Sequence, residues 1–168
     1  MAESQIQNFN HLKIHSQYSI CEGAVKIDEL KDFSKENKLK SLGICDTINL
    51  CGALEFSEKL SKIGTQPIIG TQIYFKYANT LGLLPLFALN EEGYKNIIEL
   101  SSLSYLNNET ISEPHLDLNK LLEKNGGVAL FSGTINGLSG QLFNKGKFTE
   151  INELYLPVSY THLTLPTT

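Results

Sequence analysis

Residues 42–75 read LGICDTINLCGALEFSEKLSKIGTQPIIGTQIYF, and the fold follows from this stretch. The apolar run 42–45 predicts a buried strand that ends at Asp46, and residues 67–75 predict a second strand. Between them, residues 52–63 place apolar side chains at helical spacing, at Leu54, Phe56, Leu60 and Ile63. A strand, a helix and a strand in this order imply parallel pairing through a right-handed crossover.

The same alternation continues on both sides of this stretch. Further strands are expected at residues 11–15, 83–89 and 128–131. Further helices are expected at residues 26–37, 91–106, 117–125, 138–143 and 148–154. Asn90 is a suitable cap for the helix at 91–106. We therefore expect an α/β fold, a layered sheet or a barrel with parallel pairing, in which chemistry lies at the carboxyl ends of the strands.

Composition indicates one globular domain without a dominant nucleic-acid-binding face. The chain has 168 residues, 41% of them hydrophobic, and 14 basic against 18 acidic side chains give a net charge of −4. Gripping phosphate backbones needs a basic face, which this balance does not favour. The start of the chain lacks a signal-peptide pattern, and no run approaches the roughly 20 apolar residues of a membrane span. A cytoplasmic location without membrane contact is expected.

The cysteines and two of the histidines predict no site of their own. Cys21, Cys45 and Cys51 match no zinc-binding or redox spacing, so we expect three small, buried, apolar side chains in a reducing compartment. His115 lies in a polar stretch, where we expect it to be exposed or to cap a turn. His162 falls in a terminal segment of unusual composition.

Two histidines and a carboxylate form the candidate site. In an extended segment 11–15, His11, Lys13 and His15 would project from one face. Asp46 ends the next strand, where a barrel would place it beside them. Such a group could begin a metal site. However, the Lys13 ammonium would repel a divalent cation, and two histidines at this spacing are often incidental, so the residues alone leave both interpretations open.

Three motifs in order resemble one known family. HLKIHSQYSICEGAVKIDEL, LGICDTINLCGALEF and QPIIGTQIYF are similar to the N-terminal PHP (polymerase and histidinol phosphatase) domain of bacterial DNA polymerase III alpha subunits. The segments FALN, NEEGYKNIIEL and VALFSGTINGLSGQL extend the resemblance over residues 9–157. It implies a distorted (β/α)7 barrel, of which this chain would hold an incomplete part, and a replicative polymerase as the parent protein.

The resemblance also assigns the candidate site. Family members with an intact metal site carry five ligands in these motifs, and they correspond here to Lys13, His15, Asp46, Thr47 and Gln72. His11 is the first histidine of the same motif. Only His15 and Asp46 keep a ligand chemistry, because Lys13 is cationic and Thr47 and Gln72 are neutral. We therefore expect a vestigial site with no metal and no catalytic residue, in which Lys13 could form a buried ion pair with Asp46.

Two functions follow from the resemblance. The first is a structural PHP domain that docks a proofreading exonuclease or other replicase subunits, while Mg²⁺-dependent polymerisation and DNA contact belong to a missing palm and other domains. The alternative is an active metal-dependent phosphoesterase or 3′-5′ exonuclease with Mn²⁺ or Zn²⁺, in which His11, His15 and Asp46 are ligands. An unrelated α/β barrel enzyme would leave the three motifs unexplained.

The ends of the chain are expected to lie outside the domain. We expect residues 1–8 to be an N-terminal tail and residues 9–157 to be the incomplete PHP domain. Residues 154–168 contain no Asp, Glu, Lys or Arg. Because residues 158–168 (VSYTHLTLPTT) resemble translated sequencing-adapter sequence, we expect the genuine chain to be truncated near Pro157.

Overall fold

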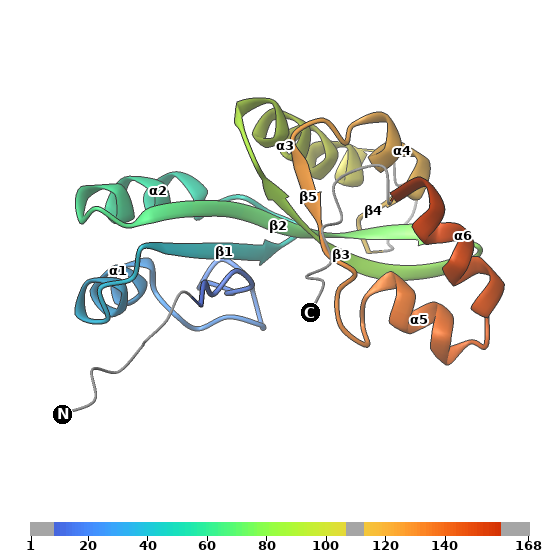
Figure 1. Cartoon of the computed structure of the whole chain (residues 1–168), viewed down its shortest axis with the longest axis horizontal. Helices are drawn as coiled ribbons and strands as arrows, with labels where there is room; N and C mark the ends of the chain where they lie inside the picture. Colours follow the sequence, from blue (N-terminus) through green and yellow to red (C-terminus); the bar gives the residue numbers. More distant parts are fainter. Residues whose placement is uncertain (1–8, 107–112, 159–168) are drawn as a thin grey trace.

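The fold is an open, mixed sheet with helices packed around it (Figure 1). The computed structural model describes residues 9–106 and 113–158. Its elements, in chain order, are α1 (Ile27–Glu36), β1 (Ser41–Thr47), α2 (Ala53–Lys62), β2 (Gln66–Tyr77), β3 (Thr80–Ala88), α3 (Glu91–Leu106), β4 (His115–Asp117), α4 (Leu118–Glu123), β5 (Val128–Leu130), α5 (Leu138–Asn144) and α6 (Phe148–Val158).

The sheet has the strand order β1-β2-β3-β5, and the short β4 pairs with β2. β1 and β2 run parallel, with Ser41 opposite Gln66 and Thr47 opposite Gln72. β4 is also parallel to β2. In contrast, β3 is antiparallel to both β2 and β5. The expected parallel pairing is therefore wrong for β3, and the strands of the described residues form an open sheet rather than a closed barrel.

A tight hairpin explains the reversed direction of β3. Ala78 and Asn79 join β2 to β3 with φ values of 47° and 56°. Two consecutive residues with positive φ are typical of a two-residue turn that matches the right-handed twist of an antiparallel pair. No crossover helix separates these strands, so parallel pairing was impossible between them.

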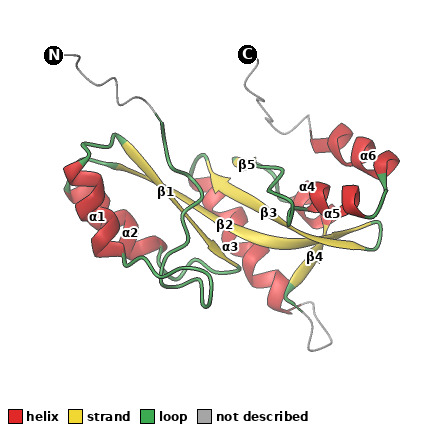
Figure 2. Cartoon of the chain, turned by 90° about the horizontal axis from the view of Figure 1, so that it is seen from below, coloured by secondary structure: helices red, strands yellow, loops and turns green. Residues whose placement is uncertain are grey.

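Two hydrophobic clusters hold the elements together. The smaller cluster joins α1, β1 and α2, and its buried members are Ile27, Leu30, Leu42, Ile44, Phe56 and Leu60. The larger one is built on β2 and β3 and includes Ile73, Phe75, Leu84, Leu86, Ile97 and Leu100. Figure 2 shows the corresponding arrangement, with α1 and α2 at one end of the sheet and α5 and α6 at the other.

β2 has one face that packs in the core and one face that carries polar groups. Ile73 and Phe75 enter the larger cluster. Since side chains alternate along a strand, Gln72 and Tyr74 point to the other face. Thr47 lies opposite Gln72 and shares that face. The candidate site is therefore built where β1 ends against the middle of β2.

Most expected elements are confirmed within a few residues, with two exceptions. Residues 11–15 do not form a regular strand, although they lie alongside β1: the Gly43 and Cys45 amides donate to the carbonyls of His11 (2.7 Å) and Ile14 (2.8 Å). β4 occupies a segment that was expected to be a polar loop. His115 pairs with Tyr74 there and is half-buried, so of the two expectations exposure is wrong, whereas a local contact exists: its Nδ1 lies 2.9 Å from the Glu113 carbonyl oxygen.

Candidate functional site

The segment that precedes α1 runs along β1 to its carboxyl end. Gly43 permits this close approach, because a Cβ atom at position 43 would lie 2.6 Å from the Leu12 carbonyl oxygen. Beyond this contact the chain turns back, and Gln17 donates its amide to the carbonyl of Val25 at 2.9 Å. The turn between them, residues 16–25, carries the groups that meet Asp46 and Thr47.

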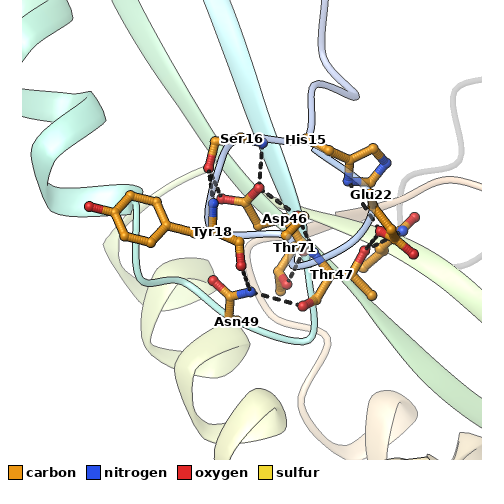
Figure 3. A network of polar contacts seen from close by, with 10 residues as sticks. His15, Ser16, Tyr18, Glu22, Asp46, Thr47, Asn49 and Thr71 are labelled. Carbon is orange, nitrogen blue, oxygen red and sulfur yellow. Dashed lines mark hydrogen bonds and ion pairs between the residues drawn. The ribbon is translucent and has the colours of Figure 1, made fainter. Parts of the chain in front are cut away.

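Asp46 holds this turn in place through hydrogen bonds. The residue is 2% exposed, and its carboxylate accepts hydrogen bonds from the Ser16 amide (2.6 Å) and the Ser16 hydroxyl (2.8 Å), which Figure 3 shows. It accepts a third from the Ser19 hydroxyl (2.7 Å). The Asp46 carbonyl accepts a further bond from the Thr71 hydroxyl at 2.7 Å. Carboxylates bonded in this way to buried donors form strong, charge-assisted contacts. The loop and both strands are thereby tied together.

The expected ion pair between Lys13 and Asp46 is not formed. Lys13 is exposed, whereas the Asp46 carboxylate is occupied by the two serines. Taking both charges out of water would carry a desolvation cost that serine donors avoid. The site therefore satisfies its one buried carboxylate with neutral groups.

A second polar chain lies on the other side of Asp46. The Gln72 amide donates to the Thr47 hydroxyl at 2.7 Å, and the Thr47 hydroxyl donates to Glu22 Oε2. The same Glu22 oxygen lies 3.8 Å from His15 Nδ1. His15 Nδ1 and Gln72 Oε1 are buried without a hydrogen-bond partner among the described residues. These two atoms have remaining capacity for a water molecule or a small polar ligand.

A cavity of about 320 Å³ adjoins this chain. Lys13, His15, Glu22 and Gln72 line it together with residues of the 133–137 loop. Its lining includes three of the sequence-predicted positions, and Thr47 is hydrogen-bonded to one of them. Glu22 was not predicted, since its only signal was an acidic residue in a turn.

His11 lies apart from the cavity. Its ring packs edge-on against Phe9, with ring centroids 4.8 Å apart, and its centroid is 6.5 Å from that of Phe33 on α1. The expected common face of His11, Lys13 and His15 is therefore not formed, because residues 11–15 are not a regular strand. His11 is exposed, and its ring contacts are with these two aromatic side chains.

The donor set does not fit a divalent metal. Thr47 and Gln72 are neutral, Lys13 brings a positive charge, and both Asp46 oxygens accept hydrogen bonds from the 16–19 segment. Within residues 9–106 and 113–158, no three His, Cys, Asp or Glu side chains are grouped closely enough to hold a metal ion. Hard cations require several anionic or carbonyl oxygens, and Zn²⁺ requires imidazole, thiolate or carboxylate ligands.

The cysteines differ in burial. Cys45 is buried, as expected, but Cys21 and Cys51 are exposed, so the expectation of burial is wrong for these two. Burial raises the pKa of the Cys45 thiol to about 12, because the thiolate would lose its hydration. The thiolate is the reactive form, and Cys45 therefore stays protonated near neutral pH.

The difference in burial predicts how many thiols react in the folded protein. At about pH 8, a disulfide reagent such as dithiobis(nitrobenzoate) should modify Cys21 and Cys51 in the folded protein and leave Cys45 unmodified. Denaturant should expose the third thiol to the same reagent. A Cys45→Ala variant, as the matched control, should show no additional thiol on unfolding. Rapid modification of three thiols in the native protein would contradict the assigned burial.

Comparison with known proteins assigns the chain to a family. The profile of the PHP domain family matches residues 11–159. The chain belongs to the PHP domain family. It is 38% identical over 159 residues to the DNA polymerase III subunit alpha of Caulobacter vibrioides, and 33% identical over 153 residues to that of Borreliella burgdorferi. These alignments cover 89% and 84% of this chain, but only 14% and 13% of the two relatives.

Similarity to solved structures is lower. An amidohydrolase from Chromobacterium violaceum aligns with 94% of this PHP chain and 56% of its own chain, with a TM-score of 0.44 and 13% identity.

No helix within the described part of the chain is long and apolar enough to cross a membrane.

Proposed function

We propose that this chain is part of a bacterial DNA polymerase III alpha subunit, in which it serves as a non-catalytic PHP domain. The observation that supports this role most directly is the 38% identity to such a subunit over 159 residues, combined with a site whose donors do not suit a metal. Template-directed DNA synthesis, with Mg²⁺ as its cofactor, would belong to other domains of the parent protein. The domain would act in the cytoplasm.

We further propose that the domain is an incomplete (β/α)7-type barrel and contributes a docking surface for a proofreading exonuclease or another replicase subunit. The acidic balance of the chain supports protein contacts over direct phosphate binding, because a nucleic-acid face needs an excess of positive charge. In this proposal, Gln72, Thr47 and Glu22 replace metal coordination with hydrogen bonds that join β2, β1 and the 16–25 turn.

The alternative, an active phosphoesterase or exonuclease, would require a cation at this site. His15 is the residue that favours it, because the buried Nδ1 atom has no hydrogen-bond partner among the described residues. Lys13 and the neutral Thr47 and Gln72 oppose it. Water activation needs a metal with fixed ligands and an open position, and these residues supply neither.

Metal content tests this proposal. The purified 168-residue chain, loaded with Mn²⁺ or Zn²⁺ and then dialysed, should retain substoichiometric metal by elemental analysis. Its thermal midpoint should not change when EDTA is added. A native-state ligand present at about 1,000 times its Kd would add about 4 kcal/mol of stability, so loss of a functional metal would be readily measured. Two or more tightly bound ions per chain would overturn the non-catalytic assignment.

A further inference from the structure

A second cleft, of about 430 Å³, lies beside the candidate site on the polar face of β2. Segments from different parts of the chain line it: the 18–22 turn, the 47–49 loop after β1, Tyr74 of β2, Tyr105 of α3, and Glu113 with Pro114 ahead of β4. Glu22 lines both this cleft and the smaller cavity described above. Thr47 of the candidate site also lines this cleft, and Asn49 donates to the Thr47 carbonyl.

Two tyrosines supply its aromatic surface. Tyr105 is 55% exposed, and its hydroxyl donates to the Ile48 carbonyl at 3.0 Å, which fixes the end of the side chain. Tyr74 is half-buried. Tyrosine is enriched at protein interfaces, because it combines a large rigid contact area with a polar end.

Acidic side chains face these aromatic groups. Burial, followed by the charges of Glu113 and Glu22, raises the pKa of the Tyr74 hydroxyl. Burial, a cysteine and Glu113 raise the pKa of the Tyr105 hydroxyl. The contacts of Glu22 with Thr47 and His15 both use Oε2. Among the described residues that line the cleft, none is Lys, Arg or His.

This combination selects for a cation. Carboxylates repel phosphate groups, whereas they attract a guanidinium, which also stacks favourably on aromatic faces. Ile20, at the rim, is 85% exposed and offers an apolar contact beside the charged group. The 168-residue sequence contains no arginine, so a guanidinium bound here must come from outside it.

Two residues in the walls of the cleft have unusual backbone conformations. Cys21 and Ile48 have φ values of 65° and 55°. A β-branched residue such as isoleucine rarely adopts this left-handed region. Asn49 braces the loop by donating its amide to the carbonyls of Tyr18 (3.0 Å) and Thr47 (2.9 Å). These contacts preform the shape of the cleft.

We infer that this cleft docks a partner protein segment by receiving an arginine side chain, with an aliphatic neighbour of that arginine against Ile20. This contact rests on the proposed docking role of the domain and does not depend on metal binding at the adjacent site. Charge complementarity favours a basic peptide over nucleic acid, which would bring phosphates to Glu22 and Glu113.

A peptide titration of the ¹⁵N-labelled 168-residue chain tests the inference. The probe is acetyl-Leu-Arg-Gly-amide, and its matched control replaces arginine with citrulline, which has nearly the same shape without the charge. The arginine peptide should shift amide resonances of the 18–22 and 47–49 segments and of Tyr74 and Tyr105. Citrulline should bind about tenfold more weakly, because the charge-assisted and cation–π contacts are lost.

Substitutions in the cleft test whether the arginine peptide binds there. Glu113→Gln and Tyr105→Leu should each weaken arginine-peptide binding about fivefold or more. Glu58→Gln, which removes an exposed charge on α2, should leave it unchanged. Should Tyr105→Leu lose its native spectrum, Tyr105→Phe keeps the ring and should retain most of the affinity. Equal binding of both peptides, shifts outside the cleft, or stronger shifts from oligothymidine would overturn the inference.

Discussion

Asp46→Ala is expected to destabilise the protein by about 3 kcal/mol or more, the largest effect of any single polar substitution that we predict. The carboxylate is buried and accepts three hydrogen bonds from Ser16 and Ser19. Truncation would leave those donors in a buried place without an acceptor. Urea unfolding followed by far-UV circular dichroism measures the change as a lower transition midpoint.

Two further variants separate a hydrogen-bonding role from simple loss of charge. Asp46→Asn keeps one acceptor oxygen and should lose less stability than Asp46→Ala. Ser19→Ala should cost about 1–2 kcal/mol, and less when Asp46 is already alanine, because the Ser19 hydroxyl then keeps only its bond from the Thr47 amide. Glu58→Gln provides an exposed acidic control. Additive effects of Asp46→Ala and Ser19→Ala would show that Asp46 does not act through the 16–19 turn.

Restoring the family ligands is expected to create a metal site. The structure places Lys13, His15 and Gln72 around one cavity, with Thr47 hydrogen-bonded to Gln72. The combined variant Lys13→His, Thr47→His and Gln72→Glu would replace a cation and two neutral groups with ligands suited to Zn²⁺ or Mn²⁺. At a metal concentration of about 100 Kd, the linked stabilisation is about 2.7 kcal/mol, measurable as a higher thermal midpoint.

The control for this experiment is the same combined variant with His15→Ala added. His15 is the family ligand whose imidazole has a nitrogen without a hydrogen-bond partner among the described residues beside the cavity, so its removal should abolish most of the metal-dependent stabilisation. The unaltered chain should show no metal-dependent change. A combined variant that folds and yet gains no stability with metal would show that the substitutions at 13, 47 and 72 are not what prevents binding.

The sequence predicted the existence of most elements but not how all of them pair. Hydrophobic periodicity distinguishes the helix at 91–106 from the strand at 67–75, because the two patterns have different periods. It carries no information about strand direction, and the Ala78–Asn79 turn lacks the glycine that usually marks a hairpin. β4 is only three residues long and exists because it pairs with β2, so no local pattern announces it.

The sequence predicted which residues would form the candidate site better than it predicted the contacts between them. The motifs identified His15, Thr47 and Gln72 as neighbours, and the structure places them around one polar chain. The partners of Asp46 were not predictable, because Ser16 and Ser19 reach it through the path of the turn before α1. The side chain of Thr47 points to the opposite face and joins a second network, while its amide donates to the Ser19 hydroxyl. Glu22 joins the second network only through the path of the turn, which depends on tertiary contacts.

The length of β2 has a consequence for the order in which the protein assembles. This 12-residue strand pairs with β1 and β4 along one edge and with β3 along the other, and both hydrophobic clusters contact it. The β2–β3 hairpin needs only a two-residue turn, whereas β1 and β4 must close longer loops to reach β2. We therefore expect the hairpin to nucleate folding, and the turn that shapes both the candidate site and the tyrosine cleft to become ordered only after β1 has docked.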